Sequence, residues 1–191
     1  MESLRHHFNQ FELLSNTDWE RIESYLKPVQ LTKGDYFLQE GQVSRRLGWI
    51  TSGICRYAYS NEAGDECTKY FIREQQFASG ADSFRSGQPS SESIQALTNV
   101  SMVAFSRDAY ERLFDEVPVW GRLVQKVTEH AYAQKVRLIS PMVVQDARSR
   151  YEAFLRTQPD VVQRVPLGLI ASYLGMTQQS LSRLRRQLAV G

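Results

Sequence analysis

The C-terminal end of the chain carries the pattern that most limits how the protein can fold. Hydrophobic residues recur at helical spacing over residues 167–174, and Gly175 follows them. Glycine accepts the left-handed conformation that ends many helices without steric cost. Thr177 is a candidate N-cap for a second helix, on which Leu181 and Leu188 share one face. The pattern predicts two short helices around a tight turn, the helix-turn-helix arrangement whose second helix suits a DNA major groove.

The charge pattern favours a DNA-reading helix over an ordinary helical hairpin, which the spacing alone fits equally well. No Asp or Glu follows Asp160, whereas four arginines do, at positions 164, 183, 185 and 186. A basic segment without acids is expected of a phosphate-binding surface. Gln178 and Gln179, unless they only face solvent, suit adenine edges, and Arg183 suits guanine. The other polar residues suit phosphates or capping, and the full set of candidate DNA contacts is Thr177, Gln178, Gln179, Ser180, Ser182, Arg183, Arg185 and Arg186.

The composition limits the class of protein. A chain of 191 residues with 42% hydrophobic content suffices for one large domain or two small ones. Its net charge of +2 is too small for the whole surface to bind nucleic acid, so any DNA affinity must be local. No stretch approaches the ~20 apolar residues of a membrane span, and the N-terminus lacks the apolar run of a signal peptide. We therefore expect a cytoplasmic protein with no membrane partner.

The cysteines and histidines indicate no metal site. Cys55 and Cys67 lie in predicted strands, where they are open to a disulfide, half of a metal site, or burial as two small residues. Burial is the commonest of these in a cytosolic chain. No CxxC motif is present, and His6 and His7 are adjacent while His130 is distant, which is not ligand spacing. We expect no metal, and no cofactor beyond a small-molecule effector.

The middle of the chain has the texture of a β structure. Short runs rich in aromatic and β-branched residues alternate with glycine turns between Val29 and Phe105. The predicted strands are 29–31, 36–38, 47–50, 54–59, 68–72, 93–97 and 101–105. Six or more short strands at this spacing indicate an all-β barrel or sandwich. Helices are expected on either side, two within residues 1–27, the second ended by Pro28, and one over 107–114.

A long helix is predicted from Pro118 to about Ile139 and is ended by Pro141. Another helix follows, with Val144 and Leu155 on its apolar face, and ends near Thr157. Along the long helix, the residues of one face recur in alternating steps of four and three, which is the spacing of a heptad repeat. The seam pairs two subunits in one interpretation and packs on its own domain in the other. The seam residues are Trp120, Val124, Val127, Ala131, Gln134 and Leu138.

These elements and their motifs resemble the CRP/FNR family of bacterial transcription regulators. Residues 33–42 and 49–56 are similar to the family's glycine-punctuated β-roll, and the long helix takes the place of its dimer interface. Residues 165–185 closely match its hydrophobic-Ala-x-x-Leu-Gly-x-(Thr/Ser)-x-x-x-(Leu/Val)-(Ser/Gly)-Arg pattern. The resemblance covers nearly the whole chain. It implies an α+β fold with a double-stranded β-helix or jelly-roll sensor and N-terminal helices over 1–117, a dimerisation helix over 118–140, and a DNA-binding domain over 141–191.

The resemblance also implies partners and an effector site. The partners are double-stranded DNA at a pseudo-palindromic site, a second copy of the chain, and RNA polymerase. Members that bind cyclic AMP hold its ribose with a Glu and its phosphate with an Arg, but here those positions are Ala81 and about Ser91-Glu92. We therefore do not expect cyclic AMP as the effector, and we expect a polar small molecule instead. The candidate effector pocket is Phe77, Ser79, Gly80, Ala81, Ser83, Arg85, Ser91, Glu92 and Ser93.

Two other functions were weighed against a sequence-specific regulator. The family commonly continues past its recognition helix into a β-hairpin wing, and this sequence stops at residue 191. Together with the altered cassette, this motivates a small-molecule sensor or interaction module with a degenerate DNA-binding end. The second alternative, an enzyme, is disfavoured because the sequence has no Ser/His/Asp or Cys/His constellation, no paired carboxylates at a glycine-rich loop and no phosphate-binding loop motif.

Overall fold

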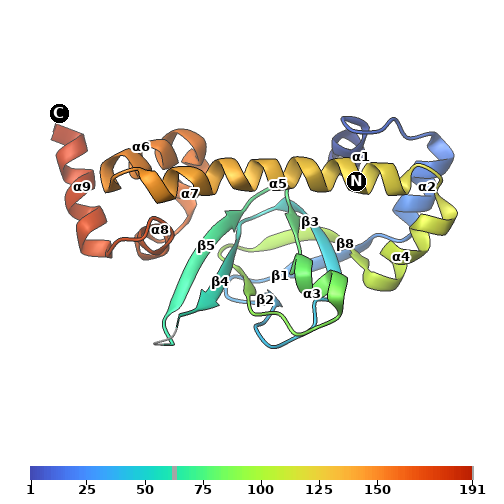
Figure 1. Ribbon diagram of the computed structural model, residues 1–191, viewed down its shortest axis with the longest axis horizontal. Coiled ribbons are helices and arrows are strands. Elements are labelled where there is room, and N and C mark those ends of the chain that lie inside the picture. Colours follow the sequence, from blue (N-terminus) through green and yellow to red (C-terminus); the bar gives the residue numbers. More distant parts are fainter. Residues whose placement is uncertain (62–63, 191) are drawn as a thin grey trace.

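The computed structural model describes residues 1–61 and 64–190, and it divides into a β-roll, a long helix and a group of C-terminal helices. The long helix α5 (Trp120–Val144) runs across the top of the β-roll in Figure 1. The N-terminal helices lie at one end of α5, and the C-terminal helices lie at its other end. The β-roll therefore contacts helices from both ends of the chain.

The β-roll consists of two four-stranded antiparallel sheets. One has the order β1-β8-β3-β6 and the other β2-β7-β4-β5, so β5 is an edge strand. Side chains between the sheets form a core that includes Ile50, Ile94 and Met102. All seven strands predicted from the sequence are present, within two residues at their ends. The bounds are β1 Lys27–Leu31, β2 Tyr36–Leu38, β3 Arg46–Ser52, β4 Cys55–Ser60, β5 Glu66–Ile72, β6 Phe77–Ala78, β7 Ser93–Ala96 and β8 Val100–Ser106.

The N-terminal helices and the start of α5 share a second core. It is built from α1 (Glu2–Asn9), α2 (Asn16–Ser24) and α4 (Arg107–Glu116), which cover the outer side of β3 and β8. Ser15 caps α2, because its hydroxyl accepts from the N–H of Asp18 and the Asp18 carboxylate accepts from the N–H of Ser15. Pro28 does not end this helix, which stops at Ser24, and lies instead in β1.

The prediction that Pro141 ends the long helix is wrong, because α5 continues to Val144. The change of direction is fixed by the next helix, α6 (Ala147–Thr157), whose N-cap is Asp146. The Asp146 carboxylate accepts a hydrogen bond of 2.8 Å from the N–H of Ser149. A proline removes one backbone hydrogen bond from a helix, whereas this cap sets where the next one begins.

The C-terminal helices pack on the β-roll through a shared core. They are α6, α7 (Pro159–Arg164), α8 (Leu167–Tyr173) and α9 (Gln178–Val190), of which α7 is absent from the sequence prediction. Ile54, Phe71 and Leu97 from the β-roll join a core with Phe154 and Leu181. The two cysteines lie in β4 and β5, as predicted, and are free thiols.

Candidate nucleic-acid interface and effector cavity

The predicted helix pair is present as α8, a tight turn and α9. Gly175 has a φ of +67°, so the turn uses the left-handed conformation for which glycine is suited. The Thr177 hydroxyl accepts from the N–H of Ser180 at 3.2 Å, which makes Thr177 the N-cap of α9. Leu181 is fully buried against α8. The apolar face of α9 is therefore core, and its other face is turned outward.

The candidate DNA contacts lie on that outward face. Six of them are exposed, and Ser180 and Ser182 are half-buried. No ion pair holds Arg183, Arg185 or Arg186 within the described part of the chain. An exposed helix face with three such guanidinium groups has the charge that phosphate contacts require.

Arg164 does not belong to this basic surface, although the sequence grouped it with the other arginines. Its guanidinium pairs with the Glu74 carboxylate of the β-roll at 2.8 Å. The pairing lowers the pKa of Glu74, against the raising effect of burial, and raises the pKa of Arg164. The lack of acids after Asp160 could not show this, because the partner lies 90 positions earlier in the sequence.

Gln178 is exposed, and its side chain lies beside Gly168 of α8. A Cβ added to Gly168 would lie 2.9 Å from its Oε1 atom, so the side chain occupies the space that the glycine leaves. Sequence spacing could not place Gln178 against Gly168, because the contact depends on the angle between the two helices.

The helix pair is docked on the edge of the β-roll. The backbone N–H of Thr68 donates a hydrogen bond of 2.9 Å to the hydroxyl of Ser172. Arg73 of the β-roll pairs with Asp160 of α7 at 2.7 Å, and the rings of Phe71 and Tyr173 have centroids 5.4 Å apart. These contacts give the unpaired edge of β5 a partner from α8.

The predicted effector residues are divided among several places. Phe77, Ser79 and Ala81 line a largely apolar cavity of about 370 Å³ beside α5. Gly80 is buried where an added Cβ would lie 2.6 Å from Leu38. Arg85 is exposed beside Asp82 at 3.4 Å.

Three serines of the predicted set are buried, and two of them accept hydrogen bonds from backbone N–H groups distant in the chain, whereas the Ser79 hydroxyl has no hydrogen-bond partner within the described ranges. The Ser83 hydroxyl accepts from the N–H of Ser44 at 2.9 Å, and the Ser93 hydroxyl accepts from the N–H of Glu40 at 2.9 Å. Only Ser91 and Glu92 line the larger cavity described next.

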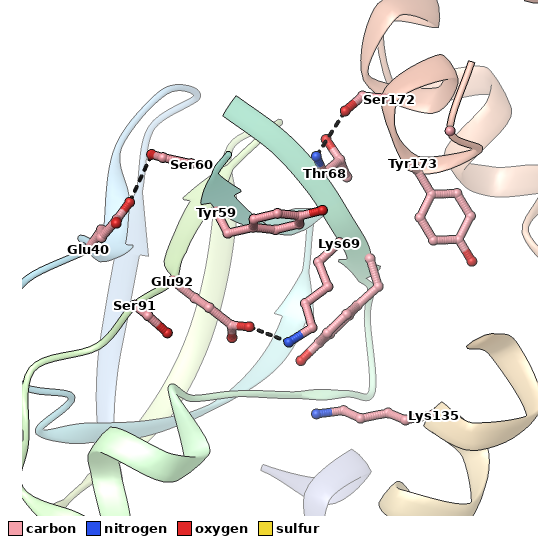
Figure 2. A pocket seen from close by; sticks show the side chains of 12 residues that line it. Glu40, Tyr59, Ser60, Thr68, Lys69, Ser91, Glu92, Lys135, Ser172 and Tyr173 are labelled. Atoms are coloured by element: carbon pink, nitrogen blue, oxygen red, sulfur yellow. Dashed lines mark hydrogen bonds and ion pairs between the residues drawn. The ribbon is translucent and has the colours of Figure 1, made fainter. Parts of the chain in front are cut away.

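A cavity of about 670 Å³ opens between the β-roll, α5 and the helix pair (Figure 2). Its walls come from β4 and β5, the loop before β7, Lys135 of α5, and the end of α8 with its turn. Most of these residues lie outside the set that the sequence predicted, since elements distant in the chain supply them. The lining residues are Glu40, Tyr59, Ser60, Thr68, Lys69, Tyr70, Ser91, Glu92, Lys135, Ser172, Tyr173 and Gly175.

In the described part of the chain, one ion pair joins two of the four charged side chains of this cavity, and Glu40 and Lys135 stand outside it. Lys69 pairs with Glu92, and the Glu40 carboxylate accepts from the hydroxyl of Ser60 at 3.0 Å. The Lys135 ammonium lies 4.9 Å from the ring centroid of Tyr70 and has no ion pair with an acid in the described ranges. The Lys135 side chain is exposed overall, but partial desolvation of its ammonium lowers its pKa; Glu92 raises that pKa and Lys69 lowers it. Burial also raises the pKa of Tyr70, so its hydroxyl stays neutral.

The residues present do not fit cyclic AMP bound in the manner of the family that the sequence resembles. In the motif comparison made from the sequence, Ala81 offers no carboxylate for a ribose and about Ser91-Glu92 replace the phosphate-binding Arg. In the structure, Glu92 pairs with Lys69. The Tyr57 hydroxyl donates to the carbonyl of Ser79, and its ring lies 4.3 Å from that of Tyr70. A cyclic phosphate here would meet a carboxylate and two tyrosine rings.

The predicted dimer seam faces the chain's own core over its first turn. Trp120 is 1% exposed and packs against Phe8 and Phe105, so its assignment to a subunit interface is wrong. It lies where α1, α4 and β8 converge, and the heptad spacing cannot distinguish that core from a partner helix. Val124, Val127 and Ala131 are half-buried and Gln134 is exposed, all four beside the 370 Å³ cavity, while the Leu138 side chain lies outside the described residues.

Comparisons with known proteins show what the chain is similar to. Residues 28–117 match the cyclic nucleotide-binding domain family. The fold matches that of the c-di-GMP-responsive global regulator CLP of Xanthomonas campestris, with a TM-score of 0.72, 15% identity and 92% of each chain covered. It also matches a CRP/FNR-family transcriptional regulator of Eubacterium rectale, with a TM-score of 0.72, 17% identity, and 93% of this chain and 84% of that one covered. The match to the catabolite activator protein of Thermus thermophilus has a TM-score of 0.58 and 18% identity, and it covers 94% of this chain and 85% of that one.

No curated protein sequence gives a significant match. At these identities, the likeness to solved structures establishes the α+β fold with its antiparallel jelly-roll, and the neighbours are regulators rather than enzymes. Within residues 1–61 and 64–190, no helix has both the length and the apolar character to cross a membrane. The same ranges hold no cluster of three or more His, Cys, Asp or Glu side chains arranged to bind a metal.

Proposed function

We propose that this chain is a sequence-specific DNA-binding transcription regulator of the CRP/FNR type. The observation that carries the proposal is the exposed polar face of α9, where Gln178, Gln179 and Arg183 precede two further arginines without acid partners. Glutamine pairs bidentately with adenine and arginine with guanine, while the remaining arginines suit phosphates. The α8 helix and the Gly175 turn hold this face outward.

The regulator acts as a homodimer on a pseudo-palindromic site. Two copies of α9 would enter successive major grooves about 34 Å apart. Val124, Val127, Ala131 and Gln134 of α5, together with Leu138, remain the proposed contact between subunits. Their half-buried or exposed surface beside the α5 cavity leaves apolar area for a second helix to cover. RNA polymerase is a further proposed partner of the bound dimer, and the protein works in the cytoplasm.

Selection from random double-stranded DNA tests this function. The full chain should enrich a palindrome with half-sites one helical turn apart, and its affinity should fall with salt. A variant with Arg183→Ala should lose enrichment at one position of each half-site. Recovery of no common sequence by the native chain, at low salt and with soluble dimeric protein, would overturn the proposal.

A second candidate function is a small-molecule sensor whose helix pair serves as an interaction module. The observation that favours it is the docking of the C-terminal helices on the β-roll, through the Thr68–Ser172 hydrogen bond of β5 with α8 and the Glu74–Arg164 ion pair with α7. In that case, the native chain and a variant with Arg183, Arg185 and Arg186 all changed to Gln would bind DNA with the same low affinity. The selection experiment separates the two functions directly.

A further inference from the structure

We infer that the 670 Å³ cavity between the β-roll and the helix pair is the effector site, and that it takes an aromatic monocarboxylate. The regulatory role of the ligand rests on the proposed function, whereas binding of the ligand does not require DNA. The cavity size lies in the range of small-ligand sites. Its lining combines aromatic faces with a small number of charged groups, which is the usual composition of such sites.

The charge of the ligand follows from Lys135. Lys69 and Glu92 form an ion pair, and the exposed Glu40 keeps its own charge while it accepts from the hydroxyl of Ser60. Among the residues that the structure describes, Lys135 is therefore the cation of the lining that has no ion pair with an acid. In Figure 2, its ammonium points into the cavity below Lys69 and Glu92. One carboxylate would complete an ion pair with Lys135. A dianionic phosphate would carry more charge than this lysine balances and would lie close to the Glu92 carboxylate.

The ring of the ligand follows from the tyrosines. Tyr59, Tyr70 and Tyr173 line the cavity from β4, β5 and α8. Figure 2 labels Tyr59 and Tyr173. Tyr59 is 40% exposed in this structure, so it offers uncovered ring surface. Flat aromatic groups pack on such rings in stacked or edge-on arrangements. A planar ring bearing a carboxylate therefore satisfies both features of the lining.

The position of the cavity connects the ligand to the helix pair. Ser172, Tyr173 and Gly175 belong to α8 and the turn that precedes α9, whereas Tyr59 and Tyr70 belong to the β-roll. A ligand that touches both parts binds the docked arrangement more tightly than an undocked one. It therefore shifts the population toward docking by its differential affinity.

Isothermal titration of the full chain with four probes tests the site. The probes are 2-naphthoate, its neutral amide, the non-planar decahydro-2-naphthoate and the dianion 2-naphthyl phosphate. We expect 2-naphthoate to bind with a Kd of about 1 mM or below, and each of the other three at least tenfold more weakly. Absence of naphthoate binding, or equal binding of the amide, would overturn the inference.

A matched pair of lysine variants locates the ligand. Lys135→Met should weaken naphthoate binding at least tenfold and leave amide binding unchanged, whereas Lys33→Met on an exposed turn should change neither. Naphthoate should also slow amide hydrogen exchange at Tyr70 and Tyr173 together. Unchanged affinity in Lys135→Met would place the ligand elsewhere and overturn the assignment. The titration contains no DNA, so a failed DNA selection would not affect the ligand-binding result. A failed titration would likewise leave the proposed DNA-binding function untouched.

Discussion

The backbone N–H of Thr68 donates a hydrogen bond of 2.9 Å to the side-chain oxygen of Ser172, which joins the edge strand β5 to α8. The sheet leaves this N–H without a strand partner, so the helix pair supplies the acceptor. Ser172→Ala would leave a partly buried donor unsatisfied at a cost of about 1 kcal/mol. We expect faster amide hydrogen exchange at Thr68 and a small fall in the urea midpoint.

The control for this change is Ser24→Ala, whose hydroxyl donates to the carbonyl of Arg21 within the exposed α2. It should leave Thr68 exchange as it is in the native chain. If Ser172→Ala left exchange at Thr68 unaltered, the docked arrangement would not be the one that the protein populates in solution.

Trp120→Ala should lower the free energy of unfolding by about 3–5 kcal/mol, because it opens a cavity among packed aromatic rings. Trp120 is 1% exposed, and its ring is 5.9 Å from that of Phe8 and 5.6 Å from that of Phe105. The loss belongs to one subunit, so it should be the same in urea titrations at low and high protein concentration. Tyr132→Ala on the same helix, where Tyr132 is 70% exposed, should change stability by less than about 0.5 kcal/mol.

Much of the fold could be predicted from local sequence chemistry. The seven longer strands follow from β-branched and aromatic runs between glycine turns, and the helix pair follows from Gly175 and Thr177. Short elements could not be predicted, because the two residues of β6 and the six of α7 form no repeat. Pro141 misled the prediction because a proline lowers helix stability without fixing where a helix stops.

The candidate sites divide in the same way. The outward face of α9 was predictable because a single helix carries it and its periodicity is visible in the sequence. The 670 Å³ cavity was predictable only at Ser91 and Glu92, since Tyr59, Lys135 and Tyr173 come from three separate elements. Trp120 was assigned to the seam because an apolar helix face has the same spacing whether it packs on its own domain or on a partner.

Arg183→Ala should cost about 1–3 kcal/mol of specific DNA binding and relax the preference at one base. Arg185→Ala should weaken binding to all sequences alike and reduce the slope of log affinity against log salt by about 1, as expected for one phosphate contact. Gln187→Ala, an exposed position on the same helix, serves as the control. Gel shifts at several salt concentrations measure all three, and equal losses of specificity for Arg183→Ala and Arg185→Ala would contradict the assigned roles.

His7 should make the protein less stable in mild acid. Burial, and to a lesser extent the neighbouring His130 and His6, lower the pKa of His7 from 6.5 to about 4, and its ring lies 4.6 Å from that of Trp49. The unfolded chain therefore binds the proton more readily than the folded one. Stability that is complete above pH 6.5 should fall as the pH drops toward 4, by less than about 2 kcal/mol because the ring is partly solvated. Urea titrations between those pH values should show this slope in the native chain and in His6→Gln, but not in His7→Gln; an unchanged slope in His7→Gln would assign the effect to another group.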